Sequence, residues 1–441
     1  MGRNTIQEAE RQRNRPASPA HARHAGRGAL RLLTYVTILF QISAFVLLAL
    51  KTQPIDVQAL ILAAAFPLGT LALDMLIRRV WHADRALLML VMLISSIGMV
   101  TLVDITKPVT ARSQALFFIV AIAAMLIAIV IIRRMTRWEK WSWAAMAVSL
   151  VLMLLPMAPV IGGWTNGARN WVTFKKLGLN IGFQPSEFVK MLLLVVLSSA
   201  LAQKRGMKRM IPALGFAVCM CLILLVVQRD LGTLLIYFFL TIGLFYIATS
   251  NLMLTGLGLA GGCVGAVGAY YLFDHVRTRV AIWKNPWSDP QKTGYQIVQA
   301  LIAIGSGGMF GQGLGLGTPR MIPYYHTDFI FAAICEEFGI LFGVGLLVLY
   351  CFVFMRGIKI ALEATTAYHS LMAFGATLML AVQTFVIVGG VTKMIPLTGV
   401  TLPFVSAGGS SLMSCMMLVG ILLGISSLNR QEREKALREG T

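Results

Sequence analysis

The chain has 441 residues, of which 57% are hydrophobic and 13% are charged, and its mean hydropathy is +0.77. Soluble proteins carry charge on about a quarter of their residues, so this composition excludes a soluble globular protein. The 38 Lys and Arg residues exceed the 18 Asp and Glu residues, which gives a formal net charge of +20. The excess lies in a tail and in short segments rather than in a folded basic domain, so no nucleic-acid partner is expected.

The chain begins with residues 1–28, a polar, Arg-rich stretch without the apolar run of a cleavable signal peptide. We expect it to be a disordered, basic cytoplasmic tail. The other end, residues 429–441, is a second charged stretch that we also expect in the cytoplasm. The six Cys residues fall inside apolar runs with no metal-ligand spacing, so no metal site is predicted.

Apolar runs between the two tails are long enough to cross a bilayer, which takes about 20 helical residues. They predict an all-α integral membrane protein, a polytopic bundle of about 12 transmembrane helices. The sixth run is short, and the seventh and eighth are separated only by a turn at Gln228–Asp230. The expected spans are 29–50, 55–77, 86–103, 113–132, 141–161, 187–202, 209–228, 230–249, 252–273, 329–355, 368–392 and 404–428.

The distribution of Lys and Arg residues predicts the orientation of these spans. With the N-terminus in the cytoplasm, an even number of spans returns the C-terminus there. Most cations then fall in the tails and in short cytoplasmic loops, as the positive-inside rule requires. We therefore expect a multi-pass protein of the cytoplasmic membrane with both termini inside.

Two segments on the outer side, 162–186 and 274–328, are too long for simple turns. The second contains YQIVQALIAIGSGGMFGQGL, whose apolar face at helical spacing predicts short re-entrant or interfacial helices around a cavity. Cations on this side run against the positive-inside trend, which favours an anionic partner such as a phosphate or diphosphate. The alternative is a general attraction to anionic lipid. These cations are Arg169, Lys175, Lys176, Arg277, Arg279, Lys284, Lys292 and Arg320.

The stretch Pro323–Gly339, PYYHTDFIFAAICEEFG, has His326, Asp328, Glu336 and Glu337 where a polar loop becomes an apolar helix. Hydrocarbon does not solvate charge, so ionisable groups at such a boundary indicate a functional site. The alternative is a buried ion-pair cluster that only fixes helix packing.

Three shorter signals fall on the same side of the membrane. Glu187 and Lys190 are three residues apart and share one helix face. The turn QRDLGT contains Asp230. The segment 395–411, IPLTGVTLPFVSAGGSS, ends in Ser410 and Ser411, and its glycines allow the backbone to approach a ligand closely.

Six motifs together resemble the SEDS family, the RodA, FtsW and SpoVE proteins of bacterial elongation, division and sporulation. The resemblance covers about residues 86–428. It implies a peptidoglycan glycosyltransferase of the bacterial cell membrane that polymerises lipid II, the undecaprenyl-diphosphate-linked muropeptide. It also implies a class B penicillin-binding protein as partner. The motifs are NGARNW (166–171), QPSEFVK (184–190), QRDLGT (228–233), GYQIVQALIAIGSGGMFGQGLG (294–315), HTDFIFA (326–332) and PLTGVTLPFVSAGGSS (396–411).

The resemblance assigns roles to particular residues. Asp328 matches the family's proposed catalytic carboxylate, and Glu187 with Lys190 matches its ion pair beside a central cavity. Asp230 matches the Asp of the family's Q-P-D-L-G-T turn, and Arg169 matches an arginine of an outer loop. His326 either orients Asp328 or only packs beside it. We assign His326, Ser410, Ser411 and the outer-loop cations Arg277, Arg279, Lys284 and Arg320 to the substrate cavity.

The chain also departs from the family pattern. Arg229 replaces the usual Pro, Tyr324 and Tyr325 replace Glu-Ala, and Ala407 replaces a Tyr. The family has ten helices, so residues 78–428 correspond to its core and residues 29–77 to an added hairpin. The hairpin has none of the matched motifs, and we expect it to pack peripherally or to contact a partner's transmembrane helix.

The chemistry of glycan polymerisation accounts for a single carboxylate. A sugar hydroxyl attacks an anomeric carbon whose leaving group is a lipid diphosphate, and Asp328 would take the hydroxyl proton. No cofactor is expected; a divalent cation is compatible with this chemistry, but the sequence has no ligand motif for one. A lipid-linked precursor flippase would use the same cavity without a proton acceptor. A non-catalytic scaffold for a penicillin-binding protein would need the polar cluster only for packing.

Overall fold

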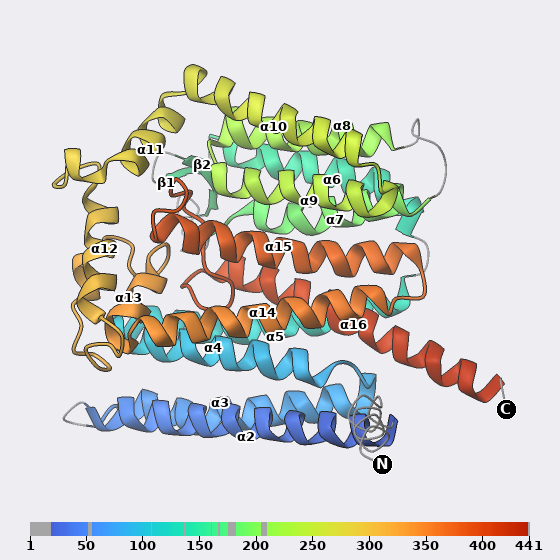
Figure 1. Ribbon diagram of the computed structural model, residues 1–441, viewed down its shortest axis with the longest axis horizontal. Helices are drawn as coiled ribbons and strands as arrows, with labels where there is room; N and C mark the ends of the chain where they lie inside the picture. The colour runs from blue at the N-terminus through green and yellow to red at the C-terminus, as the bar shows by residue number, and fades with distance from the viewer. Residues whose placement is uncertain are drawn as a thin grey trace, which may run out of the picture.

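The computed structural model describes residues 19–51, 55–106, 108–135, 138–159, 161–165, 168–174, 182–203 and 210–439. Within these ranges, 11 helices are long and apolar enough to cross a membrane. They lie side by side with nearly parallel axes (Figure 1). The expected polytopic helical membrane protein is confirmed, and the span predicted at 141–161 is a shorter apolar helix, Ser142–Met157.

The helices of the bundle continue in several places into a π- or 3-10 turn. They are α2 (Pro19–Lys51), α3 (Val57–Leu76) with η1 (Ile77–Trp81), α4 (Arg85–Ile105), α5 (Pro108–Arg134), α6 (Ser142–Leu154) with η3 (Leu155–Met157), α7 (Pro185–Ala202), α8 (Ile211–Leu222) with η6 (Ile223–Gln228), α9 (Leu231–Thr249), α10 (Leu252–Leu272), α14 (Ile340–Leu362), α15 (Ala367–Val391) and α16 (Gly409–Glu439).

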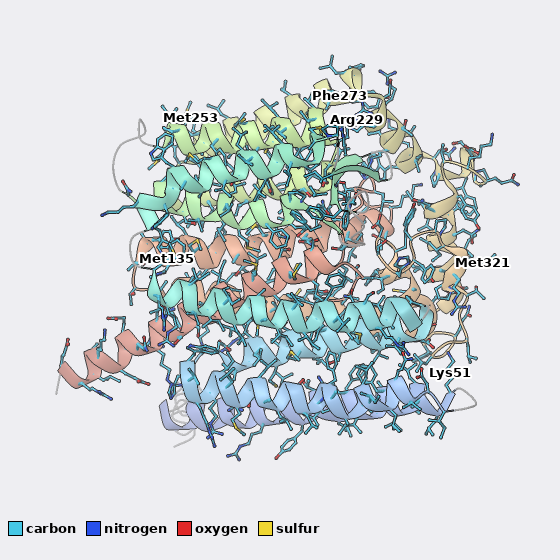
Figure 2. The ribbon with its side chains drawn as sticks, turned by 180° about the vertical axis from the view of Figure 1, so that it is seen from behind. Lys51, Met135, Arg229, Met253, Phe273 and Met321 are labelled. Carbon is cyan, nitrogen blue, oxygen red and sulfur yellow. The ribbon has the colours of Figure 1, made fainter. Side chains whose placement is uncertain are left out.

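Short elements gather at one end of the bundle, which we call the site end. The described start of α2 and the end of α16 lie at the opposite end (Figure 1). Figure 2 shows Lys51, Arg229 and Met321 at the site end, with Met135 and Met253 at the other. The short helical elements at the site end are α11 (Asp274–Lys284), η7 (Pro286–Ser288), α12 (Tyr295–Gly307), η8 (Pro319–Met321) and α13 (Ile330–Phe338). A further short element, η2 (Trp138–Trp141), lies at the opposite end.

The segment 274–328 contains the short helices that its apolar periodicity predicts. Helix α12 runs across the ends of the membrane-crossing helices rather than along them (Figure 1). The other long segment contains a small antiparallel sheet that the sequence did not predict. Its order is β1 (Gly162–Thr165), β2 (Ala168–Thr173) and β3 (Gly182–Phe183).

The N-terminal hairpin packs on the bundle through α4. The buried side chain of Gln41 donates to Thr70 Oγ1 (3.0 Å) and Ser96 Oγ (2.8 Å), so one amide joins α2, α3 and α4. Helix α2 already begins at Pro19 and α16 continues to Glu439, so both helices extend into the segments expected to be tails.

Two helix breaks shape the site end. The span expected at 329–355 is two helices, α13 and α14, because Gly339 between them has a φ of 87°. A Cβ on Gly339 would lie 2.4 Å from the Met309 carbonyl oxygen, so only glycine fits. The break expected at Gln228–Asp230 is confirmed, since Arg229 is left-handed (φ 59°) and Asp230 caps α9.

Residues 392–408 form an irregular segment inside the bundle, between α15 and α16. Its residues Leu402, Phe404 and Val405 are buried. Helix α4 approaches it closely at Gly98, where a Cβ would lie 2.5 Å from the Val405 Cα. The segment therefore packs directly against α4.

We predict that Gly339→Ala destabilises the protein, because a positive φ costs a residue with a side chain about 1–3 kcal/mol before the clash is counted. The thermal midpoint in detergent should fall by several degrees. Gly345→Ala in α14 is the matched control, since nothing lies within 4 Å of a Cβ there. Equal midpoints for both variants would contradict the prediction.

Candidate active site

A cavity of about 650 Å³ opens at the site end, between β2, α7, α9, α11, α12, the loop before α13 and the irregular segment before α16. It brings together residues that are far apart in sequence. The predicted site residues that line it are Glu187, Asp230, Arg279, His326, Asp328, Ser410 and Ser411.

Asp328 lies two residues before α13 and is half-buried in the cavity wall. Its loop is held by the irregular segment, because Ala407 N donates to the His326 carbonyl (2.8 Å) and Ser406 Oγ to the Thr327 carbonyl (2.7 Å). A Cβ on Gly399 would lie 3.6 Å from Asp328 Oδ2, so the carboxylate faces bare backbone. Burial raises the pKa of Asp328 to about 6, against the opposing effects of the Thr327 hydrogen bond and Arg279.

Asp230 is also in the cavity wall, but its oxygens are already occupied. Oδ1 accepts from Thr233 N (3.0 Å), while Oδ2 accepts from Thr233 Oγ1, Asn170 Nδ2 and Gln184 Nε2, each at 2.9 Å. These four donors fix the position of the Asp230 carboxylate. Asp230 therefore joins β2, α7 and α9, and its carboxylate is a part of the cavity wall.

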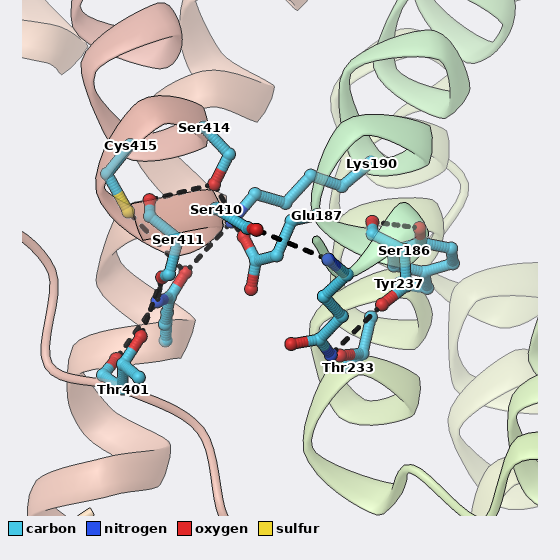
Figure 3. Close-up of polar contacts among 12 residues, drawn as sticks. Ser186, Glu187, Lys190, Thr233, Tyr237, Thr401, Ser410, Ser411, Ser414 and Cys415 are labelled. Atoms are coloured by element: carbon cyan, nitrogen blue, oxygen red, sulfur yellow. Dashed lines mark hydrogen bonds and ion pairs between the residues drawn. The ribbon is translucent and has the colours of Figure 1, made fainter. Parts of the chain in front are cut away.

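Glu187 and Lys190 form the ion pair that their spacing predicts. Lys190 Nζ lies 2.6 Å from Glu187 Oε2, and the two side chains are 1% and 10% exposed. Ser414 Oγ, from α16, donates to the same carboxylate oxygen at 2.5 Å (Figure 3). Only Glu187 lines the cavity, and Lys190 lies behind it.

Gln383 of α15 extends this network to the irregular segment. Lys190 Nζ donates to Gln383 Oε1 (3.2 Å), and Gln383 Nε2 donates to the Thr401 carbonyl (2.9 Å). Thr401 Oγ1 in turn donates to Ser411 Oγ at 2.6 Å. One connected set of hydrogen bonds therefore ties α7, α15 and α16 behind the cavity floor.

Two guanidinium groups line the cavity, those of Arg229 and Arg279. Arg279 donates from Nη1 to the Leu397 carbonyl at 2.8 Å, which directs its side chain onto the irregular segment. Burial lowers the pKa of His275 on α11, and the charges of Arg229 and Arg279 lower it further. This wall therefore has a positive field suited to an anion.

Four cations assigned to the cavity from the sequence do not line it. Ala168 and Asn170 of β2 line the cavity, whereas the side chain of Arg169 between them points to the other face of the strand. Arg169 donates to the Met157 carbonyl (3.0 Å). The other three are Arg277, paired with Asp274 (3.6 Å); Lys284, exposed on α11; and Arg320, which donates to the Ile105 carbonyl (3.1 Å). Lys292 is exposed, and Lys175 and Lys176 are outside the described residues.

His326 lines the cavity two residues before Asp328. Its ring is half-buried and edge-on to Tyr325, with centroids 5.0 Å apart. Burial lowers the pKa of His326, which favours the neutral imidazole. Within the described chain its Nδ1 has no hydrogen-bond partner.

Sequence reasoning missed four polar residues of the site. Asn170, Gln184 and Thr233 bind Asp230, and Gln383 binds Lys190. Asn170, Gln184 and Thr233 lie inside motifs already quoted, and Asp-x-x-Thr at a helix start is a capping signal. Gln383 is a polar residue in the middle of an apolar helix, which is itself a sign of function. In the described ranges, no group of three or more His, Cys, Asp or Glu side chains could hold a metal ion.

Lys190→Met should destabilise the protein strongly, because losing one partner of a buried ion pair costs roughly 3–5 kcal/mol. The thermal midpoint and the amount of folded protein should both fall. Adding Glu187→Gln should recover part of the loss, since no unpaired charge then remains. Lys284→Met is the control for an exposed lysine, and a midpoint like that control in Lys190→Met would refute the prediction.

Comparison with known proteins identifies the family. The FtsW/RodA/SpoVE family, described as cell cycle protein, matches residues 75–431. Peptidoglycan glycosyltransferase RodA of Mycobacterium tuberculosis is 34% identical over 370 residues, 78% of each chain. Stage V sporulation protein E of Bacillus subtilis is 37% identical over 301 residues, 66% of this chain and 81% of its own length.

Solved structures give the same result. One described as the structural coordination of polymerization and crosslinking by a peptidoglycan synthase complex has a TM-score of 0.64 and 28% identity, and covers 79% of this chain and 99% of its own. Rod shape determining protein RodA of Thermus thermophilus has a TM-score of 0.55 and 27% identity, with 78% and 96% covered. The chain belongs to the FtsW/RodA/SpoVE family of multi-pass membrane proteins, in which similar members are named peptidoglycan glycosyltransferases.

Proposed function

We propose that this protein is a peptidoglycan glycosyltransferase that polymerises lipid II, with Asp328 as the catalytic base. The observation that carries the proposal is the difference between the cavity's carboxylates. Glu187 is paired with Lys190 and Asp230 accepts four hydrogen bonds, whereas Asp328 has a raised pKa and faces the glycine backbone of residue 399.

The geometry supports a proton transfer at Asp328. The acceptor sugar's hydroxyl is a weak nucleophile at its ordinary pKa, so a carboxylate within hydrogen-bonding distance must take its proton as the new glycosidic bond forms. A base with a pKa of about 6 is deprotonated at neutral pH and still accepts a proton well. The bond from the anomeric carbon to the diphosphate oxygen breaks with its electron pair, and the lipid diphosphate leaves as an anion.

The cations of the cavity support binding of that diphosphate. Arg229 and Arg279 present guanidinium groups that can bind phosphate oxygens in a bidentate manner. Ser410 and Ser411 lie in the first turn of α16 and line the cavity, so the positive end of that helix dipole faces the same space. These groups can stabilise negative charge as it develops on the leaving group.

Orientation and partnership belong to the same proposal. The start of α2 and the end of α16 lie opposite the site end, so cytoplasmic termini put the cavity on the outer face of the bacterial cytoplasmic membrane (Figure 1). The solved relative described as coordinating polymerization and crosslinking supports a crosslinking partner, which we propose to be a class B penicillin-binding protein.

Asp328→Asn should abolish glycan polymerisation by the purified protein supplied with lipid II, with at least a hundredfold loss of rate and little change in thermal midpoint. Asp274→Asn is the control, since that carboxylate is exposed. A polymerisation rate near that of the unmodified protein in Asp328→Asn would refute the assignment. Lipid II translocation without polymerisation by the unmodified protein would favour a flippase instead, and the absence of both activities in that protein would favour a scaffold.

The polymerisation rate should rise with pH through about 6 and level off above 7. The reason is that a base acts only when deprotonated, and the pKa of Asp328 is raised to about 6. The measurement is kcat/KM for lipid II between pH 5 and 8 in one mixed buffer of constant ionic strength. A flat profile across that range would contradict a role for Asp328 as the base.

A further inference from the structure

A second cluster of ionisable groups lies at the site end, outside the cavity lining. Lys51, the last residue of α2, belongs to the hairpin that precedes the family match at 75–431. Its Nζ lies 2.5 Å from Oδ1 of Asp104, which is near the end of α4. The Asp104 side chain is only 3% exposed. The hairpin is therefore joined to the core by an ion pair whose carboxylate, Asp104, is buried in the core.

Glu337 of α13 is the third member of this cluster. It is 1% exposed and in hydrogen-bonding contact with Asp104. Asp104 Oδ2 and Glu337 Oε2 are buried and have no donor among the described residues, so one proton shared between the two carboxyl groups satisfies both. Burial and the nearby Asp104 raise the pKa of Glu337 above its ordinary value. One proton and the Lys51 ammonium then neutralise two carboxylates.

The cluster holds a glycine-rich loop, residues 311–317. The Gly315 backbone donates to the Glu337 carboxyl group, and Gly313 N donates to the Glu337 carbonyl (2.9 Å). Gly315 has a φ of 68°, and a Cβ there would lie 1.3 Å from Lys51 Nζ. The ammonium thus occupies the space where a side chain at residue 315 would begin.

The same loop leads directly to the catalytic aspartate. Gln312 N donates to the Glu336 carbonyl (2.9 Å), and Thr318 N donates to Glu336 Oε1 (3.0 Å). Arg320 then anchors the following turn on the Ile105 carbonyl. Lys51 and Met321 lie at the same end of the molecule (Figure 2). A continuous series of contacts therefore connects α2 with residues 318–320, where the segment that ends at Asp328 begins.

We propose that Lys51 is a positioning residue, which holds the loop 311–317 through Asp104 and Glu337 and so fixes the segment that presents Asp328 to the cavity. This rests on the proposed function of Asp328. It gives the added hairpin, expected from sequence to be peripheral, a part in building the active site. Without the ammonium, the Asp104 charge is buried and unpaired, and the carboxyl pair can no longer hold Gly315 in place.

The test compares Lys51→Met with Lys51→Met/Asp104→Asn in full-length protein. Lys51→Met should lower kcat for lipid II polymerisation at least tenfold and leave apparent KM within threefold, because the cavity lining is unchanged. Hydrogen–deuterium exchange should accelerate in peptides covering 308–320. The double variant should recover at least a third of the kcat and slow exchange, because no unpaired charge remains. Lys140→Met, an exposed lysine, is the control.

Unchanged exchange across 308–320 in Lys51→Met, or a kcat within twofold of the unmodified protein, would overturn the proposal. If the single variant does not accumulate, the double variant decides: slow exchange and recovered kcat support the proposal, and fast exchange overturns it. The exchange measurement needs no substrate. If the unmodified protein fails to polymerise lipid II, the proposed function is wrong, and the exchange data still decide whether Lys51 holds the loop.

Discussion

The site depends on keeping irregular backbone inside an apolar helix bundle. Residues 392–408 cannot use helical hydrogen bonds, and hydrocarbon offers no substitute, so each buried carbonyl and amide needs a protein partner. Carbonyl groups of this segment accept from four side chains on three helices: Trp283 and Arg279 on α11, Gln383 on α15 and Tyr350 on α14. The partners that satisfy this backbone also position the cavity.

This constraint separates the cavity's acids by role. Glu187 is paired with Lys190 and accepts a hydrogen bond from Ser414, and Asp230 accepts hydrogen bonds from the donors around the start of α9. These contacts fix the cavity walls. Asp328 faces the backbone of Gly399, whose φ of 79° favours glycine. Glu187 and Asp230 are thus bound by several donors, whereas the proposed base, Asp328, faces the cavity, so the carboxylates differ in their hydrogen-bond partners.

The sequence predicted the membrane-crossing helices well, because apolar length alone determines them. It also predicted that Asp328, Glu187 and Asp230 share one site, because each lies in a motif at the start of a helix on the same side of the membrane. It did not predict which outer cations line the cavity, because that depends on which face of β2 or α11 each side chain occupies. Nor could it predict Gln383 or the Lys51–Asp104 contact, which join residues distant in sequence and have no local pattern.

The size of the cavity limits what the protein can recognise. A volume of about 650 Å³ is typical of a pocket for a drug-sized molecule. The substrate proposed above, a muropeptide on its lipid, is far larger than this volume. The cavity would then hold the diphosphate and the adjoining sugar, with the stem peptide in solvent and the lipid tail in the bilayer. Such a pocket would recognise the linkage that breaks rather than the peptide attached to it.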